Sequence, residues 1–182
     1  MAWFLVLSLL VLNAVNVHSA ANNFDQPVNF NCPKKSQSIN HIHSQHDNYR
    51  EDRLFTYECK EIPTVSSDLR ATCYKTGYVN AYDEEVLFKC EPNYYINGIH
   101  SVHNNYHEDR IWAFTCCHIP DFQMHGCKYS GWTNDYDHLE NFYVEHGHVL
   151  AGVISRHNNY HEDRIFQYEI CQVARECVDV FD

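Results

Sequence analysis

The chain has 182 residues, and 24 aspartates and glutamates against 13 lysines and arginines give it a formal net charge of −11. This acidic balance argues against binding to nucleic acid, or to an anionic membrane, through charge alone. Nine cysteines in so short a chain indicate a disulfide-bonded fold made in an oxidising compartment.

The chain begins with a leader-like segment. The apolar run WFLVLSLLVLNAV at 3–15 is followed by small residues in HSAAN at 18–22. This order is typical of a secretory signal peptide, with cleavage expected between Val17 and Asn22. The run is short for a membrane span, and no later segment is apolar enough to be one. We therefore predict a signal peptide at 1–21, secretion to the extracellular space, no membrane insertion, and a single domain at 22–182.

The domain reads as three similar units, at about 22–76, 77–130 and 131–182. Each unit opens with an Asn, an aromatic residue and an Asp, in NNFD (22–25), NAYD (80–83) and NDYD (134–137). Each later carries one polar phrase, written HDNYREDRL at 46–54 and HNNYHEDRI at 103–111 and 157–165. The three units leave almost no residues for a linker or a second domain.

An alternating strand follows each polar phrase, at 53–59, 110–117 and 164–171. In the first of these strands, Phe55, Tyr57 and Cys59 lie on one face, and Thr56 and Glu58 lie on the other. The same inward positions in the second and third strands hold Trp112, Phe114 and Cys116, and Phe166, Tyr168 and Ile170. These faces are the expected core.

A second feature precedes each phrase in the later units. Gly98 and Gly152 each separate a pair of apolar residues, and a β-bulge at these places would turn both members of the pair onto one face. No segment shows a helical period. We therefore predict an all-β fold, with three internal repeats of about 55 residues in a closed pseudo-threefold arrangement, stabilised by disulfides.

Two cysteine positions recur in the first two units and are both absent from the third, where Val144 and Ile170 stand. A bonded pair predicts this joint loss, because loss of one member alone would leave a free thiol. The expected bridges are Cys32–Cys59 and Cys90–Cys116.

Two further cysteine positions recur. One holds Cys117 and Cys171 in the second and third units, and the other holds Cys73, Cys127 and Cys177. Pairing these two positions within each unit predicts the bridges Cys117–Cys127 and Cys171–Cys177. Cys73 is then left unpaired, because Lys60 stands where its partner is expected. A free Cys73 is either a buried thiol or the link in a disulfide-bonded dimer. Each bridge would stabilise the fold by roughly 2–4 kcal/mol.

The chain resembles the dermatopontin family from about Asn22 to its end. The resemblance is carried by the E-D-R-[LI]-[FW]-x-[YF] segments at 51–57, 108–114 and 162–168, by FNCP at 30–33, and by CC at 116–117. The family includes matrix proteins that associate with proteoglycan and collagen fibrils and support cell adhesion. The motif HNNYHEDR resembles the invertebrate branch of the family more closely, which includes haemagglutinins and an amoebocyte aggregation factor.

The polar phrase offers two kinds of residue. Its Asp and Arg, next to an inward aromatic face, favour a buried ion pair that fixes the turn. Its Asn, Tyr and Glu are the types that bind sugars, since planar polar groups bond hydroxyls and a ring covers the apolar sugar face. The expected ion-pair residues are Asp52, Arg53, Asp109, Arg110, Asp163 and Arg164. Arg110 is expected to pair with Asp109 or a neighbouring acid. The ligand-binding candidates are Asn48, Tyr49, Glu51, Asn105, Tyr106, Glu108, Asn159, Tyr160 and Glu162.

Metal and catalytic sites are not predicted. The H-x-x-x-H pairs at 103–107 and 157–161 would bind zinc on a helix, but this segment reads as a loop. Calcium at Glu51 and Asp52 would compete with the arginine that follows them. No nucleophile elbow, phosphate loop or dinucleotide fingerprint occurs. We therefore expect no metal, no cofactor and no enzymatic activity.

These observations favour a secreted, haemagglutinin-like adhesion or aggregation protein that binds cell-surface glycans or proteoglycans through its N-Y-x-E-D-R loops. Three weak copies on one molecule would give the multivalent binding that agglutination needs. The alternative is a structural extracellular-matrix protein that binds collagen fibrils or proteoglycan without lectin activity. Free sugars or heparin would block the first and leave a fibril binder unaffected.

Overall fold

The computed structural model describes residues 20–62, 70–120 and 122–175, so most of the expected signal peptide lies outside the described residues. Within these ranges the chain forms strands joined by turns and contains no helix, which confirms the all-β prediction, and none of it is a helix long and apolar enough to span a bilayer. The strands are β1 (Val28–Asn31), β2 (Gln37–Asp47), β3 (Asp52–Glu61), β4 (Thr72–Lys75), β5 (Val86–Lys89), β6 (Tyr95–Asn104), β7 (Asp109–His118), β8 (Phe122–Tyr129), β9 (Glu140–Tyr143), β10 (His148–Asn158) and β11 (Asp163–Arg175).

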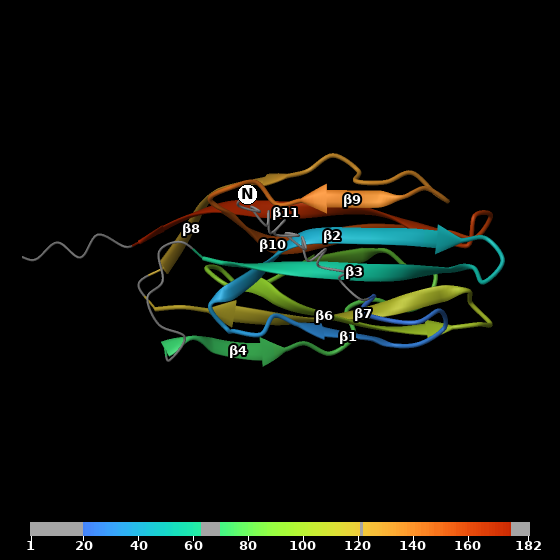
Figure 1. Ribbon diagram of the computed structural model, residues 1–182, viewed down its shortest axis with the longest axis horizontal. Coiled ribbons are helices and arrows are strands. Elements are labelled where there is room, and N and C mark those ends of the chain that lie inside the picture. The colour runs from blue at the N-terminus through green and yellow to red at the C-terminus, as the bar shows by residue number, and fades with distance from the viewer. Residues whose placement is uncertain (1–19, 63–69, 121, 176–182) are drawn as a thin grey trace, which may run out of the picture.

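Three long antiparallel hairpins, β2–β3, β6–β7 and β10–β11, form the centre of the fold. Each hairpin comes from one unit, and its turn is the polar phrase found in the sequence. The three turns lie at the same end of the molecule, on the right in Figure 1. Loops far apart in the sequence therefore meet at one end of the structure.

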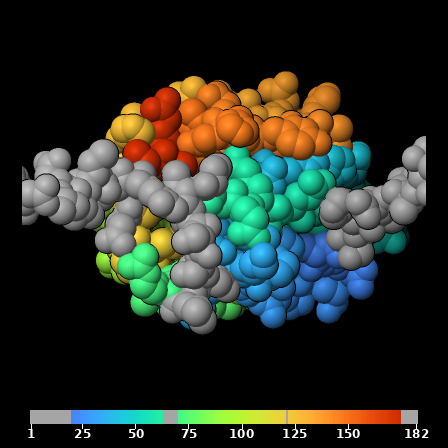
Figure 2. All heavy atoms as spheres, turned by 60° about the vertical axis from the view of Figure 1, so that its left-hand side comes forward, coloured from blue at the N-terminus to red at the C-terminus, as the bar shows by residue number. Residues whose placement is uncertain are grey.

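Each hairpin pairs along one edge with a short strand of a different unit. Strand β1 of the first unit pairs with β6, β5 of the second pairs with β10, and β9 of the third pairs with β2. The resulting sheets have the orders β1-β6-β7-β4, β5-β10-β11-β8 and β3-β2-β9. In Figure 2, orange residues of the third unit lie beside cyan and teal residues of the first.

The predicted bulges are present. The register of β6 on β7 shifts between Ile96 and Gly98, and that of β10 on β11 shifts between Leu150 and Gly152. A Cβ atom on Gly98 would lie 2.8 Å from the carbonyl oxygen of Phe30. The glycine thus allows β1 to approach the hairpin closely enough to pair with it.

The inward faces of the hairpins form one hydrophobic core, as predicted. Phe55, Trp112 and Phe166, at matching positions of the three units, pack edge to face with ring centroids 5.3, 6.1 and 5.7 Å apart. Each of the three is at most 4% exposed. Edge-to-face packing suits aromatic quadrupoles, so the centre of the core is specific as well as apolar.

Two of the four predicted bridges are confirmed and the other two are wrong. Cys32 bonds Cys59, and Cys90 bonds Cys116. The remaining bridges are Cys73–Cys117 and Cys127–Cys171, so Cys73 is not free. The predicted partner of Cys171, Cys177, lies outside the described residues. No basis therefore remains for a dimer linked through Cys73.

The error has a topological cause. Strand β4 closes the first unit but pairs with β7 of the second, which places Cys73 directly opposite Cys117. Strand β8 likewise closes the second unit and pairs with β11 of the third. The Cα atoms of these two bridges lie 4.1 and 4.0 Å apart. The last cysteine of one unit therefore bonds a cysteine of the next unit, whereas the prediction kept the pair within one unit.

Candidate functional site

Three buried ion pairs lie behind the hairpin turns. In each pair an arginine donates two hydrogen bonds to one carboxylate, from Nε and Nη2. This bidentate geometry makes such pairs strong. The pairs are Arg53–Asp163 at 2.6 and 2.6 Å, Arg110–Asp52 at 2.6 and 2.7 Å, and Arg164–Asp109 at 2.6 and 2.7 Å. The sequence predicted these residues as ion pairs but placed Arg110 beside Asp109 or a near neighbour. Every pair instead joins two units.

The Asp163 carboxylate shows how these pairs respond to pH. Burial alone would raise its pKa, but the contact with His46 and the hydrogen bonds from Arg53 hold the pKa of Asp163 far below its usual range. Burial also acts against the charged form of His46, yet the carboxylate of Asp163 raises the pKa of this histidine. Asp163 therefore stays ionised beside Arg53 well into the acidic pH range.

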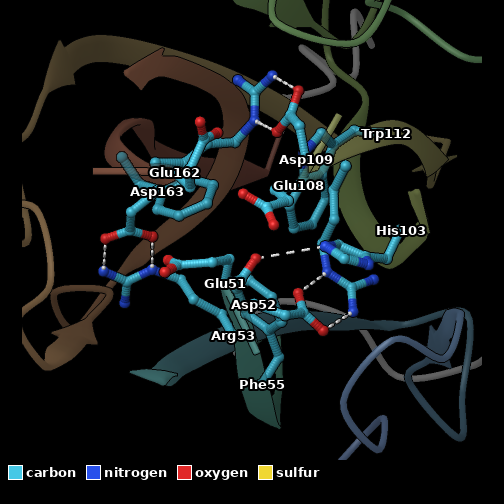
Figure 3. A pocket seen from close by; sticks show the side chains of 13 residues that line it. Glu51, Asp52, Arg53, Phe55, His103, Glu108, Asp109, Trp112, Glu162 and Asp163 are labelled. Atoms are coloured by element: carbon cyan, nitrogen blue, oxygen red, sulfur yellow. Dashed lines mark hydrogen bonds and ion pairs between the residues drawn. The ribbon is translucent and has the colours of Figure 1, made fainter. Parts of the chain in front are cut away.

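Three glutamates surround the mouth of a pocket in front of these pairs (Figure 3). Glu51, Glu108 and Glu162 come from the three turns and have φ angles of 46, 46 and 45°, in the left-handed region. The pocket has an empty volume of about 250 Å³ and is lined by the ion pairs and by the aromatic side chains of the core centre. The sequence suggested three separate sites, but the structure brings their glutamates to one.

The glutamates are electrostatically coupled. Burial raises the pKa of Glu51, and the nearby Glu108 adds to this rise, while His46 opposes it. Burial and then Glu108 raise the pKa of Glu162. Carboxylates that share one mouth repel each other, so each is easier to protonate than it would be alone. The mouth of the pocket is a region of negative charge.

The tips of the turns project beyond this mouth. Tyr49, Tyr106 and Tyr160 are 90, 90 and 89% exposed. Their neighbours Asn48, Asn105 and Asn159 are exposed as well. These Asn and Tyr candidates thus face solvent, as a contact surface requires, and the tyrosine rings lie outside the core.

Other residues hold the turns, and sequence reasoning missed them. The side chain of Asp47 accepts hydrogen bonds from the backbone N–H groups of Tyr49 and Arg50, and Asn104 and Asn158 do the same in their own turns. This is an Asx turn, which fixes the tip of each loop without help from the tyrosine side chain. The recurrence of Asp or Asn just before the Asn-Tyr pair was the available signal.

The opening motif of each unit supports the same end of the molecule. Asn22 donates to the carbonyl oxygen of Arg53 and accepts from the N–H of Phe55, and Asn80 and Asn134 repeat this contact. The backbone N–H of Asp25 donates to Asp52 at 2.9 Å. The repeated Asn-x-x-Asp pattern therefore positions the acidic half of each ion pair.

The histidines of the turns contribute by stacking. His107 stacks on Tyr82 with centroids 4.9 Å apart and contacts Asp83 at 2.9 Å. His161 makes the matching contacts with Tyr136 and Asp137. In the first unit an arginine occupies this place and lies over the ring of Phe24. The two histidines of each H-x-x-x-H pair therefore have different roles. His107 and His161 stack on the tyrosines, whereas His103 and His157 are buried beside the ion pairs.

The fold and this end define a class of protein: a disulfide-bonded β protein whose repeated turns form one exposed, tyrosine-tipped, acidic face. Residues 22–177 match the family model described as Dermatopontin. The chain belongs to the dermatopontin family.

Three relatives carry names that describe what they do or where they belong. The chain is 35% identical to the Hemagglutinin/amebocyte aggregation factor of Limulus polyphemus, over 84% of this chain and 86% of that protein. It is 33% identical to Millepora cytotoxin-1 of Millepora dichotoma, over 87% and 69%, and 30% identical to Dermatopontin of Biomphalaria glabrata, over 81% and 95%. None of these names is that of an enzyme. No solved structure shows a significant match.

Proposed function

We propose that this chain is a secreted adhesion and aggregation protein that binds cell-surface or matrix glycans with the end formed by its three hairpin turns. The observation that carries the proposal is that three turns with nearly fully exposed tyrosines lie at one end of the molecule (Figure 1), where their glutamates line one pocket. Aromatic rings cover the apolar faces of sugars, and carboxylates accept hydrogen bonds from hydroxyl groups. The name of the Limulus relative supports aggregation as the outcome.

The convergence changes the expected stoichiometry. Three separated loops would bind three ligands, whereas three loops around one mouth bind one branched or extended glycan between them. Glu51, Glu108 and Glu162 also repel a sulfated chain, so neutral or amino sugars are favoured over heparin-like ligands. A face that points one way contacts one cell, so aggregation then requires more than one copy of the chain.

The overall organisation belongs to the same proposal. We take residues 22–182 as one dermatopontin-like domain after a signal peptide, built of three repeats around a pseudo-threefold axis. The exchange of short strands among units and the three interunit ion pairs support this arrangement. Four disulfides among the described residues suit an extracellular protein.

A tyrosine substitution tests the site. Tyr106→Ala should weaken glycan binding and agglutination while costing only about 0.5 kcal/mol of stability, as expected at an exposed position. Tyr129→Ala, in β8 and 52% exposed, is the matched control. The measurements are a glycan-array screen, a titration of the hit for stoichiometry, and a cell-agglutination series. Unchanged glycan binding in a Tyr49, Tyr106 and Tyr160 triple alanine variant would refute the proposal.

A fibril-binding protein is the second candidate. The same acidic, tyrosine-rich end is suited to a basic stretch of a fibrous protein, because carboxylates pair with its cations and tyrosine rings cover its apolar groups. Such a protein would bind collagen fibrils equally well with and without added free sugars. A glycan binder would lose binding in the same competition, which separates the two.

A further inference from the structure

One cluster beside the pocket contains acceptor atoms that no donor satisfies. The side chains of Asp25, Asp52 and His103 place their ligand-type atoms within 4.8 Å of one another. The His103 ring is 1% exposed, and its Nδ1 has no hydrogen-bond partner. The Oδ1 atom of Asp25 is also buried without a partner. Unsatisfied buried polar atoms are costly, so a group bound between these two would stabilise the fold.

The state of the His103 ring follows from its other nitrogen. Nε2 lies 3.3 Å from the carbonyl oxygen of Glu51, a contact visible in Figure 3. A carbonyl oxygen only accepts hydrogen bonds, so Nε2 carries a proton, and in the neutral ring Nδ1 then presents its lone pair. Histidines that bind metals are oriented in this way, with the second ring N–H donated to a carbonyl or carboxylate.

The distance between the unsatisfied atoms suits a cation better than a proton. Nδ1 of His103 lies 3.6 Å from Oδ1 of Asp25. At this separation no hydrogen bond forms, even if the ring is protonated. A zinc ion lies about 2.0–2.2 Å from nitrogen and carboxylate ligands, so two such bonds at a tetrahedral-like angle span about this distance. Asp52, whose oxygens also accept hydrogen bonds from Arg110, lies close enough to be the third ligand.

The charges also leave room for a cation. Arg110 neutralises one of the two carboxylates through its paired contact with Asp52. The carboxylate of Asp25 remains, whereas that of Glu51 contacts His46 at 3.3 Å. A divalent cation would balance the negative charge of Asp25. The imidazole ligand favours zinc-like ions over calcium or magnesium, which prefer oxygen alone.

The equivalent histidines of the other units lie closer to carboxylates than His103 does. Asp83 contacts His107 at 2.9 Å and Asp137 contacts His161 at 2.7 Å, whereas the first unit has Arg50 at that position. His157 lies between Asp109 and Glu162, each 3.2 Å away. Although Asp83, Asp109 and His157 also lie close together, their histidine contacts a carboxylate with both nitrogens. Nδ1 of His157 also lacks a hydrogen-bond partner, so the first-unit cluster differs in that its second ring nitrogen faces a backbone carbonyl and not a carboxylate.

We propose that Asp25, Asp52 and His103 bind one divalent cation of the Zn²⁺ class beside the pocket. The site differs from the H-x-x-x-H pairs, because only the first histidine of one pair takes part. The proposal does not depend on glycan binding, and a measurement of metal binding alone tests it.

The test is a titration of chelator-treated full-length secreted protein with Zn²⁺ by calorimetry, followed by thermal unfolding with and without the metal. Wild type should bind one Zn²⁺ per chain and gain thermal stability from it. Asp25→Asn should weaken this affinity by at least about tenfold, since loss of even a supporting contact typically costs that much. Asparagine tolerates the left-handed backbone at this position, where φ is 62°.

His103→Asn should give the same loss, and His157→Asn is the matched control that keeps binding near the wild-type value. If buried His103→Asn fails to fold, Asp25→Asn decides the question, because the Asp25 side chain is 36% exposed. Wild type without a stoichiometric Zn²⁺ site would overturn the proposal. So would equal loss of affinity in His157→Asn, which would place the metal elsewhere.

Discussion

Replacement of Arg110 by alanine tests whether the buried pairs hold the units together. The guanidinium and the Asp52 carboxylate are 4 and 1% exposed, and the arginine makes a further hydrogen bond to the carbonyl oxygen of Gln26. Arg110→Ala leaves the Asp52 carboxylate buried without its charged partner, although it still accepts a hydrogen bond from the backbone N–H of Asp25. Breaking such a pair from one side costs about 3–5 kcal/mol. That loss is a large part of the stability of a single domain.

The measurement is equilibrium unfolding in guanidinium chloride with the disulfides intact. Arg156→Ala is the matched control, because Arg156 contacts Glu85 at 2.8 Å while both side chains are about half exposed. An exposed pair of this kind contributes less than about 1 kcal/mol. Arg110→Lys should fall between the two, since an ammonium group cannot reproduce the paired contact.

A double-mutant cycle sharpens the test. Asp52→Asn alone should be destabilising, and Asp52→Asn with Arg110→Ala should cost less than the sum of the single changes, because the double variant buries no unpaired charge. The reasoning is refuted if Arg110→Ala loses no more stability than Arg156→Ala, or if the two changes simply add.

Three further predictions concern pH and the cysteines. Burial, and then the charge of Lys75, lower the pKa of His100 to about 4. The stability that depends on a neutral His100 is fully present above the unfolded pKa near 6.5. It is lost as pH falls toward 4, by up to about 3 kcal/mol. His100→Gln should flatten unfolding free energies measured across that window. Burial raises the pKa of Glu140 above 4.5 although Ser44 hydrogen-bonds it, so the contribution of Glu140 to stability falls as pH rises above 4.5, and Glu140→Gln should remove that part of the pH dependence. An identical pH dependence in wild type and variant would contradict this. Non-reducing peptide mapping should recover Cys73–Cys117 and Cys127–Cys171, and a dominant Cys117–Cys127 peptide would contradict the pairing.

The sequence allowed the strand faces and the bulges to be predicted because both depend on local periodicity. Phe55 and Tyr57 alternate with polar neighbours, and the alternation alone decides which side chains face the core. Gly98 interrupts an apolar pair, and the interruption alone indicates the extra residue of a bulge. The same local pattern showed that Arg110 belongs on the inward face, where it is 3% exposed.

The partners of these residues were not predictable in the same way. Comparison among units shows that Cys117 and Cys171 are equivalent, and that Asp52 and Asp109 are equivalent. It does not show whether a contact lies within a unit or passes to the next one. Both the wrong bridges and the wrong partner of Arg110 come from choosing contacts within a unit. The convergence of the three turns escaped sequence reasoning for the same reason.

The pairing of β9 with β2 has a consequence for biosynthesis. Ile42 lies opposite Phe142, so one edge of the first hairpin finds its partner only after about a hundred further residues have been translated. At about 5–20 residues per second, this edge stays open on the ribosome for roughly 5–20 s. An unpaired strand edge can recruit the edge of another chain. Nascent chains that stop before Glu140 should therefore aggregate, and the full-length chain should fold only after its last third has emerged.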